Sequence, residues 1–370
     1  MSRPALVREL ALDSGATATL VVDRLIQGRA TGGVRIVAGA SPVDPALMAR
    51  IMTWKFSMAG VPSGGAKAVV SVPVDAPAGV RESALLELAD RTRDLVAQGI
   101  WMPGPDMGVR AESAARFLQH ASGGRRHPPR SWWTSGVSTA RSMAAAVEWG
   151  LGQLRRQLSG ATVALVGIGQ VGLPTARLLA ARGARIVGVA TWHGAWSHPV
   201  SIPLQTVAEQ GPERADVTPI TFAELLHLPV DVLILAGPDG ALAAPSAAGV
   251  QARLVASAAL IPTTPVVEAE LARREILVLP VPICSWGGVL GGALQSCGVP
   301  PRTIGAIIAT ATRLGLSRAR RRARSDGGVF NLQSVVATWA EKRAAHLEAA
   351  FASPGPWRHA RGLLPLWLYA

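Results

Sequence analysis

The sequence predicts an α/β protein of two domains, and three observations carry this prediction. Its 370 residues, 49% of them apolar and 16% charged, are more than one hydrophobic core normally holds. Short apolar runs that are typical of strands alternate with segments of helical spacing in both halves of the chain. In the second half, a glycine-rich turn stands between an apolar strand and a helix.

The first domain is expected over residues 1–130. Runs that are rich in β-branched residues and bounded by Gly or Pro predict strands, and apolar residues at helical spacing predict helices. The predicted strands cover 17–25, 33–37 and 68–72, and the predicted helices cover 45–58 and 82–96. Asp44 is placed to cap the first of these helices. A polar, proline-bearing turn over 122–130 ends the domain, and we expect a hinge near it.

The second domain, expected over residues 138–302, begins with a long helix that leads into a nearly uninterrupted apolar strand. Its predicted elements are a helix over 138–158, strands over 161–166 and 185–190 with a helix over 173–182 between them, and further strands over 231–236, 252–256 and 276–279. A sheet of about six strands is normal for such a domain. The helices from 303 onward follow it and offer a way to complete the first domain.

The turn Gly-Ile-Gly-Gln-Val-Gly over 167–172 lies between the strand 161–166 and the following helix. In this context Gly167 permits a tight turn, Gly169 lets the backbone approach a pyrophosphate, and Gly172 lets the helix pack closely on the strand. Gln170 and Val171 lie between them, where the helix N-terminus offers unpaired N–H groups to phosphates. The pattern predicts a Rossmann-type dinucleotide-binding domain.

Several other classes of protein are not favoured. Residues 276–301 carry no charge and are long enough to cross a membrane, but their prolines and paired glycines argue against a continuous helix. The charged N-terminus does not resemble a signal peptide, so we expect a cytoplasmic protein. Cys284 and Cys297 form no CxxC pair and stand near no histidine cluster, which gives a metal site or a disulfide little support.

The formal charge of +13 and the arginine cluster over 318–324 raise the question of nucleic-acid binding. No aromatic residue interleaves the cluster, and a solvated helix face or a subunit contact explains it equally well. Specific binding of nucleic acid is therefore not favoured.

Lysine is rare in this chain, which uses arginine for nearly all its cations. Only Lys55, Lys67 and Lys342 are lysines among 37 Lys and Arg residues, and the first two lie twelve residues apart. A lysine ammonium can lose its proton beside another cation and then act as a base, whereas a guanidinium stays charged. We therefore interpret the pair as chemically active.

The order of seven short motifs resembles that of the Glu/Leu/Phe/Val amino-acid dehydrogenase family, most closely its leucine and valine dehydrogenase branch. The motifs are Thr-Gly-Gly-Val-Arg (31–35), Met-Thr-Trp-Lys (52–55), Gly-Gly-Ala-Lys (64–67), Pro-Asp-Met-Gly (105–108), the glycine-rich turn, Pro-Thr-Thr-Pro (262–265) and Gly-Gly-Val (287–289). The resemblance implies an NAD- or NADP-dependent enzyme that oxidises an amino acid to its 2-oxo acid. It also implies a homo-oligomer formed through the first domain.

The resemblance implies roles for particular residues. Lys55 matches the lysine that binds the substrate α-carboxylate, Lys67 the general base, and Asp106 the acid of the proton relay. The first motif places Thr31 where glutamate-specific members carry a lysine, with Gly32 and Gly33 after it. An amino acid with an apolar side chain is therefore the expected substrate.

The chain departs from the family pattern on the cofactor side. Thr191 stands at the end of the second strand of the domain, where the family places an acid that holds the adenosine ribose, so NAD and NADP both remain open. Gly240, Leu260 and Ser285 replace asparagines of the family, and Trp133 replaces a threonine. These changes leave two alternatives open: a non-redox relative that binds an amino acid or another small ligand, and an enzyme that acts on an unusual amino acid or imine.

Overall fold

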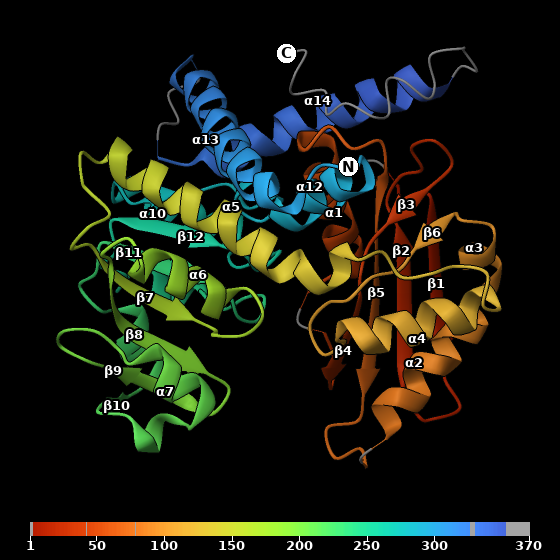
Figure 1. Ribbon diagram of the computed structural model, residues 1–370, viewed down its shortest axis with the longest axis horizontal. Helices are drawn as coiled ribbons and strands as arrows, with labels where there is room; N and C mark the ends of the chain where they lie inside the picture. Colours follow the sequence, from red (N-terminus) through yellow and green to blue (C-terminus); the bar gives the residue numbers. More distant parts are fainter. Residues whose placement is uncertain (1–2, 42, 78, 326–329, 353–370) are drawn as a thin grey trace. The chain divides into compact units, whose positions relative to one another are not determined.

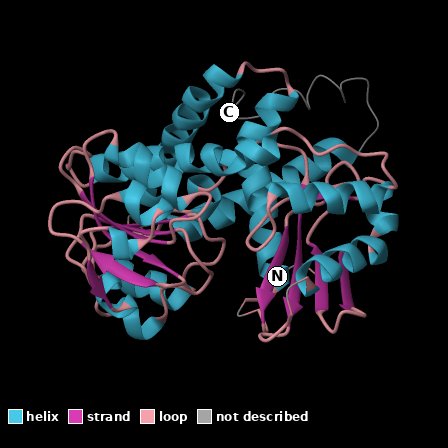
Figure 2. Cartoon of the chain, turned by 60° about the horizontal axis from the view of Figure 1, so that its bottom comes forward, coloured by secondary structure: helices cyan, strands magenta, loops and turns pink. Residues whose placement is uncertain are grey.

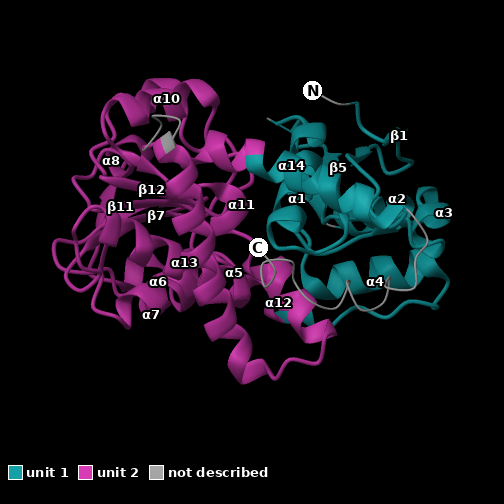
Figure 3. Ribbon diagram, turned by 90° about the horizontal axis from the view of Figure 1, so that it is seen from above, with its two compact units in different colours: residues 1–133, 339–370 teal, residues 134–338 magenta. Residues whose placement is uncertain are grey.

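The computed structural model describes residues 3–41, 43–77, 79–325 and 330–352. The chain divides into two compact units, residues 1–133 with 339–370 and residues 134–338 (Figure 3). The sequence placed the domain limits at 130 and 138 and offered residues 303–370 as a completion of the first domain. In the structure α13 (Pro301–Ser325) belongs to unit 2, and the chain returns to unit 1 at Trp339.

Unit 1 is built on a mixed sheet that has six strands within the described residues (Figure 1). The strand order is β1-β2-β5-β3-β6, and β4 also pairs with β5. β2 runs antiparallel to β1 and β5, whereas β3 and β4 run parallel to β5. The elements are β1 (Leu6–Ala11), β2 (Thr17–Val22), β3 (Ala30–Thr31), β4 (Val34–Ala38), α1 (Pro45–Met58), β5 (Gly64–Val72), α2 (Val80–Arg91), α3 (Arg93–Ala97), β6 (Trp101–Met102) and α4 (Ala111–Ser122), with the later part of α14 (Leu332–Ala352).

The two faces of β5 carry different chemistry because successive side chains of a strand point to opposite sides. Ala66, Ala68 and Val70 lie in the apolar core that the sheet shares with α2 and α4. Gly65 and Lys67 face the other way, toward α1. No side chain would fit at Gly65, since a Cβ there would lie 2.2 Å from backbone atoms of α1. The missing side chain therefore lets α1 sit directly on β5.

Unit 2 holds a sheet that has seven strands in the part of the chain that the structure describes, in the order β10-β9-β8-β7-β11-β12-β13. The five neighbouring strands β8, β7, β11, β12 and β13 pair in parallel. At the β8 edge, β9 and β10 extend the sheet with antiparallel pairing. Helices flank the strands, as Figure 2 shows. The elements are α5 (Ser131–Gln153, which begins in unit 1), β7 (Thr162–Val166), α6 (Gly172–Ala180), β8 (Arg185–Thr191), β9 (Gly194–Ser197), α7 (Leu204–Glu209), β10 (Thr218–Ile220), α8 (Phe222–Leu226), β11 (Val232–Leu235), α9 (Ala244–Ala247), β12 (Leu254–Ser257), α10 (Pro265–Arg273), β13 (Leu277–Val278), α11 (Val281–Cys284), α12 (Gly287–Ser296) and α13, with a 3-10 helix over Pro212–Arg214.

The predicted two-domain α/β fold is confirmed, but individual elements differ. The single helix expected over 82–96 is two helices, α2 and α3. They separate at Thr92, whose hydroxyl donates to the Leu88 carbonyl at 2.7 Å and so competes with the backbone. The uncharged segment 276–301 folds as the short strand β13 and the helices α11 and α12. None of the helices in the described residues combines the length and apolar character needed to cross a membrane.

The glycine-rich turn lies where the strand order of unit 2 reverses, between β7 and its neighbours β8 and β11. Gly167 has a φ of 91°, and a Cβ there would lie 2.6 Å from the carbonyl oxygen of Ala236. A Cβ at Gly172 would lie 1.9 Å from the carbonyl oxygen of Gly167. At Gly169 a Cβ would meet no atom within 4 Å. Gly167 and Gly172 are therefore needed for the fold, whereas Gly169 borders open space.

This difference predicts that alanine destabilises the protein at position 172 but not at position 169. Gly172→Ala should lower the free energy of unfolding by about 1–3 kcal/mol, because its new methyl group must displace backbone. Gly169→Ala, three residues away, is the matched control and should leave that free energy within about 0.5 kcal/mol of the parent. Urea unfolding followed by circular dichroism measures both. Equal unfolding midpoints for the two variants would contradict the close packing at Gly172.

Candidate active site

A buried group of charges gathers around the carboxylate of Asp106 in unit 1. Lys67 of β5 is 2% exposed, and its ammonium hydrogen-bonds to Oδ2 of Asp106. Arg35 of β4 is also buried, and its Nε donates to the same oxygen at 2.8 Å. One carboxylate oxygen thus accepts from two cations, which fixes its place at the centre of the site.

Two glycines let the loop of Asp106 approach the sheet. A Cβ at Gly33 would lie 2.9 Å from the Cβ of Asp106, so any larger residue would push the carboxylate away. Gly108 has a φ of 78°, and a Cβ there would lie 2.4 Å from the carbonyl oxygen of Ile36. The loop also closes on itself through the Val109 N–H, which donates to the Asp106 carbonyl at 2.9 Å. The predicted substrate residue Gly33 therefore has a clear geometric role beside Asp106.

The charges around Asp106 keep it ionised. Burial alone would raise the pKa of the Asp106 carboxyl, but the charges of Lys67 and Arg35 and their hydrogen bonds hold this pKa far below its usual value. Arg35 cannot lose its charge in this range, whereas a lysine can. Arg35 can therefore orient the carboxylate whatever the protonation state of Lys67.

Lys55 of α1 is half-buried and belongs to the same group of charges. Burial, together with the positive charges of Lys67 and Arg35, lowers the pKa of Lys55 to about 8, although the nearby Asp106 carboxylate acts in the opposite direction. The two lysines that the sequence singled out are thus brought together with Asp106, as the resemblance implied. The lowered pKa is seen at Lys55, the member of the pair that lies on the helix.

The other predicted substrate residues lie on or beside β3. The hydroxyl of Thr31 is 2.9 Å from that of the buried Ser63, and either can donate. The carbonyl of Gly32 accepts from the indole N–H of Trp101 at 3.1 Å, and a Cβ at Gly32 would lie 1.6 Å from the carbonyl oxygen of Ala66. Gly32 is therefore explained by packing, while Thr31 presents a hydroxyl where a lysine would place a cation.

Arg35 is the residue of this site that the sequence reasoning missed. It stands in the first motif, but no role was given to it. The signal was present, because Arg35 lies between Val34 and Ile36 in an apolar strand, and a charged residue buried in a strand needs a partner of opposite charge.

The glycine-rich turn in unit 2 fits a dinucleotide. Gly169 borders open space, Gln170 is exposed and Val171 is half-buried, so the backbone ahead of α6 is open to a phosphate group. Thr191 lies at the neighbouring strand end, because the Gly167 N–H donates to the Ala190 carbonyl at 2.8 Å. The Thr191 hydroxyl accepts from the backbone N–H of His193 at 3.1 Å. The five predicted cofactor residues of the turn follow the end of β7, and Thr191 lies at the adjoining end of β8.

The residues that replace the family's hydrogen-bonding side chains take structural roles. The Ser285 hydroxyl donates to the Val281 carbonyl at 2.8 Å, and Leu260 is buried. Gly240 has a φ of 71°, which an asparagine would adopt less readily than glycine. The Trp133 indole donates to Glu112 at 3.2 Å within unit 1. These four positions therefore offer backbone and packing rather than spare side-chain donors.

The arginine cluster and possible metal ligands add nothing to this site. Ala319 and Ala323 of α13 are buried and Arg320 is half-buried, whereas Arg321, Arg322 and Arg324 are exposed. Within the described ranges, no three His, Cys, Asp or Glu side chains are grouped to hold a metal ion.

Comparison with known proteins agrees with this geometry. Residues 134–297 match the family described as Glutamate/Leucine/Phenylalanine/Valine dehydrogenase, and residues 10–122 match the Glu/Leu/Phe/Val dehydrogenase dimerisation domain. Glutamate dehydrogenase B of Halobacterium salinarum is 31% identical over 282 residues, which are 71% of this chain and 66% of that protein. The NAD-specific glutamate dehydrogenase A of the same organism is 30% identical over 71% of this chain and 65% of its own length. The chain therefore spans slightly less than two thirds of these relatives.

Solved structures share the fold. The hetero-hexameric glutamate dehydrogenase from Thermus thermophilus, in a Leu-bound form, has a TM-score of 0.77 at 24% identity, covering 95% of this chain and 91% of its own. L-tryptophan dehydrogenase from Nostoc punctiforme has a TM-score of 0.64 at 18% identity, covering 93% and 97%. The two family matches together cover most of the chain, in the order in which the two sheets occur. The chain belongs to the Glu/Leu/Phe/Val dehydrogenase family.

Proposed function

We propose that this chain catalyses the NAD(P)-dependent oxidative deamination of an amino acid with an apolar side chain, and the reverse reaction. The observation that carries the proposal is the buried group in which Lys67 and Arg35 share the carboxylate of Asp106 beside Lys55. In the forward direction, amino acid, oxidised cofactor and water give 2-oxo acid, reduced cofactor, ammonium and a proton. The family supports this reaction class, and its members include the glutamate dehydrogenases named above.

Lys55 binds the α-carboxylate of the substrate in this proposal. Its ammonium lies on α1 among two other cations and one carboxylate, so the site has a positive excess that attracts an anion. A bound carboxylate offsets the repulsion between Lys55, Lys67 and Arg35. The same anion is thereby held next to the proton-transferring pair.

Asp106 and Lys67 handle the protons. Asp106 accepts a proton from the substrate amino group, and neutral Lys67 accepts one from the water that adds to the imine carbon. Asp106 then returns its proton to the amine, which leaves as ammonia, and the hydroxyl from the water gives up its second proton to this ammonia as it becomes the oxo group, so that ammonium is released; the proton taken by Lys67 passes to solvent. Because the charge of Lys67 depresses the pKa of Asp106, loss of that charge makes the carboxylate more basic when it must take a proton. Arg35 keeps the carboxylate in place throughout.

The preference for an apolar side chain rests on Thr31. Its hydroxyl is paired with that of Ser63, and it supplies no cation to a side-chain carboxylate. Burying a side-chain carboxylate without a cation costs free energy, so glutamate should have a lower kcat/KM than leucine or valine.

The nicotinamide cofactor is held by the glycine-rich turn, and it supplies the acceptor for the hydride that leaves the substrate Cα. The open backbone at Gly169 and the start of α6 receive the pyrophosphate. Thr191 brings no acid to the ribose, so both NAD and NADP are accommodated. Assembly into a homo-oligomer through unit 1 completes the proposal, supported by the dimerisation-domain match over residues 10–122.

A substrate comparison tests the reaction and its specificity. Leucine and valine should give a higher kcat/KM than glutamate with NAD or NADP, and Thr31→Lys should shift the ratio toward glutamate by roughly tenfold or more because it adds a cation. Lys67→Ala should abolish turnover without changing the circular dichroism spectrum. Turnover that survives in Lys67→Ala would refute the assignment of the base.

The pKa of Lys55 predicts a pH dependence of carboxylate binding. The ammonium form binds, so affinity for 4-methylpentanoate, a leucine skeleton without the amino group, should be constant below about pH 8 and fall by up to roughly tenfold per pH unit above it. Isothermal calorimetry measures this affinity. In Lys55→Arg the charge persists at all these pH values, so the affinity of this variant for 4-methylpentanoate should stay constant above pH 8 as well. A decline that is equally steep in Lys55→Arg would place the titrating group elsewhere.

Quenching of tryptophan fluorescence by NADH and NADPH tests the cofactor site. Both should quench, and Gly169→Ala should weaken both by roughly tenfold because its methyl group occupies the space of the pyrophosphate. The unfolding midpoint of the same variant serves as the control for its fold. If neither dinucleotide binds the parent protein, the non-redox alternative replaces the dehydrogenase.

A further inference from the structure

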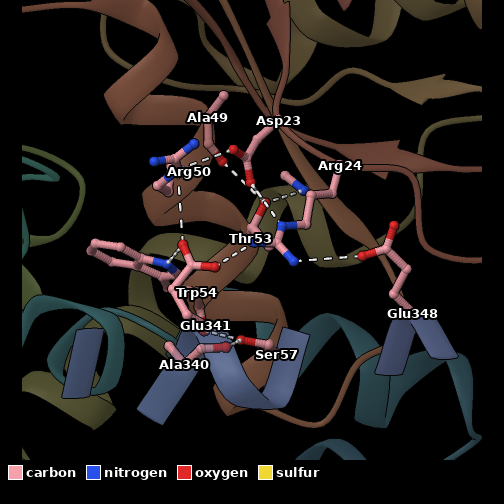
Figure 4. Close-up of polar contacts among 11 residues, drawn as sticks. Asp23, Arg24, Ala49, Arg50, Thr53, Trp54, Ser57, Ala340, Glu341 and Glu348 are labelled. Atoms are coloured by element: carbon pink, nitrogen blue, oxygen red, sulfur yellow. Dashed lines mark hydrogen bonds and ion pairs between the residues drawn. The ribbon is translucent and has the colours of Figure 1, made fainter. Parts of the chain in front are cut away.

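A second polar network in unit 1 lies apart from the Asp106 group and joins the C-terminal helix α14 to α1 (Figure 4). Its central residue is Asp23, which directly follows β2 and is 3% exposed. The Thr53 hydroxyl donates to Asp23 Oδ2 at 2.6 Å, and Arg50 Nε donates to Oδ1 at 3.2 Å. Both donors belong to α1, so the network fastens this helix to the end of β2.

The Thr53 hydroxyl also reaches β5. It accepts from the Gly65 N–H at 2.9 Å, while the Asp23 N–H donates to the Gly65 carbonyl, also at 2.9 Å. Asp23 and Thr53 together therefore satisfy both backbone groups of Gly65. A Cβ at Gly65 would lie 2.2 Å from the backbone N of Thr53, so α1 packs directly on the backbone of β5 at this residue.

The contact between Thr53 and Gly65 lies two residues before a lysine of the proposed site on both α1 and β5. Thr53 is two residues before Lys55 on α1, and Gly65 is two residues before Lys67 on β5. A slip of α1 along β5 would therefore break the Thr53 bonds and displace Lys55 relative to Lys67. The hydrogen bonds of the Thr53 hydroxyl therefore fix the position of α1 along β5.

Helix α14 closes the network from the far end of the sequence. Glu341 accepts from Arg24 at 2.5 Å and from the indole N–H of Trp54 at 2.8 Å, and it lies 3.8 Å from Arg50. Trp54 is the neighbour of Lys55 in the chain. A second contact seats the helix: the Ser57 hydroxyl donates to the Ala340 carbonyl at 3.1 Å.

The charges of this network cancel. Asp23 and Glu341 supply two negative charges, and Arg24 and Arg50 supply two positive charges. Glu348 also lies 3.5 Å from Arg24, but its side chain is 50% exposed and its charge is screened by solvent. The cluster therefore exerts little net field on Lys55, and its influence is geometric. Buried ion pairs are a poor source of stability because desolvation costs about as much as the attraction returns. Placement of α1 explains such a cluster better than stability does.

We propose that Asp23, Thr53 and Glu341 are positioning residues that hold α1 on β5 in the register that sets Lys55 against Lys67, so that helix α14 completes the carboxylate-binding site. The inference rests on the proposed function, because it takes Lys55 as the group that binds the substrate carboxylate.

Thr53→Val tests the role of the Thr53 hydroxyl, because it removes the hydroxyl while keeping a similar shape and the same charge. KM for the amino acid should rise by roughly 10- to 100-fold while kcat changes less, because Lys55 is misplaced and the Lys67–Asp106 pair is untouched. Thr53→Ser keeps the hydroxyl and should restore KM. A Thr53→Val enzyme with the parental KM would overturn the inference, and if Lys67→Ala were still inactive the proposed function would stand.

A measurement that needs no turnover separates the two proposals. With lysine labelled at Cε with carbon-13, the three lysines of the chain give a simple NMR titration, and Lys342→Arg and Lys55→Arg assign the signals. Lys55 should titrate near 8 in the parent and higher in Thr53→Val, because it moves away from Lys67, Arg35 and Asp106 and gains solvent. An unchanged Lys55 midpoint would overturn the inference even if the protein oxidised no amino acid.

The role of α14 has its own matched pair of variants, which also serves if Thr53→Val fails to fold. Glu341→Gln should raise KM by roughly tenfold. Glu348→Gln removes the same charge from the same helix, but Glu348 is 50% exposed and lies 3.5 Å from Arg24, so KM should stay at the parental value. Equal effects of the two substitutions would overturn the assignment of Glu341.

Discussion

The site in unit 1 depends on the direct seating of helix α1 on strand β5 at Gly65. There is no room there for a side chain, and the backbone groups of Gly65 bond to Asp23 and Thr53. Because α1 carries Lys55 and β5 carries Lys67, the packing of this helix on this strand brings two like charges into one site. Two ammonium groups would otherwise separate, so the protein must hold them together with bonds made elsewhere.

The arrangement divides the work between two groups of charges. In the Asp106 group the cations outnumber the carboxylate, which leaves a demand for an anion; burial and these cations together lower the pKa of Lys55. In the Asp23 network the charges balance, which leaves geometry as its main effect. Arginine supplies a permanent charge in both groups, whereas Lys55 and Lys67 belong to the Asp106 group alone.

The sequence predicted the two-domain fold and the Rossmann-type domain around the glycine-rich turn, and its motif order singled out Lys55, Lys67 and Asp106, which lie in one group of charges in the structure. These predictions rest on local patterns and on motif order, which survive without knowledge of tertiary contacts. Arg35 and the Asp23 network were not predicted, because their partners lie far away in sequence: Arg24 and Glu341 are 317 residues apart. The separation of α2 from α3 was missed for a different reason, since a single threonine hydroxyl competes with the backbone at Thr92.

The path of the chain has a consequence for the order of folding. Unit 1 is discontinuous: residues 1–133 are made first, and Glu341 follows only after the whole of unit 2. During synthesis, Arg24 and Arg50 therefore lack the carboxylate of Glu341 as a partner until α14 emerges from the ribosome. The contacts that Glu341 makes with α1 and with Arg24 can therefore form only after residues 134–338 have been made.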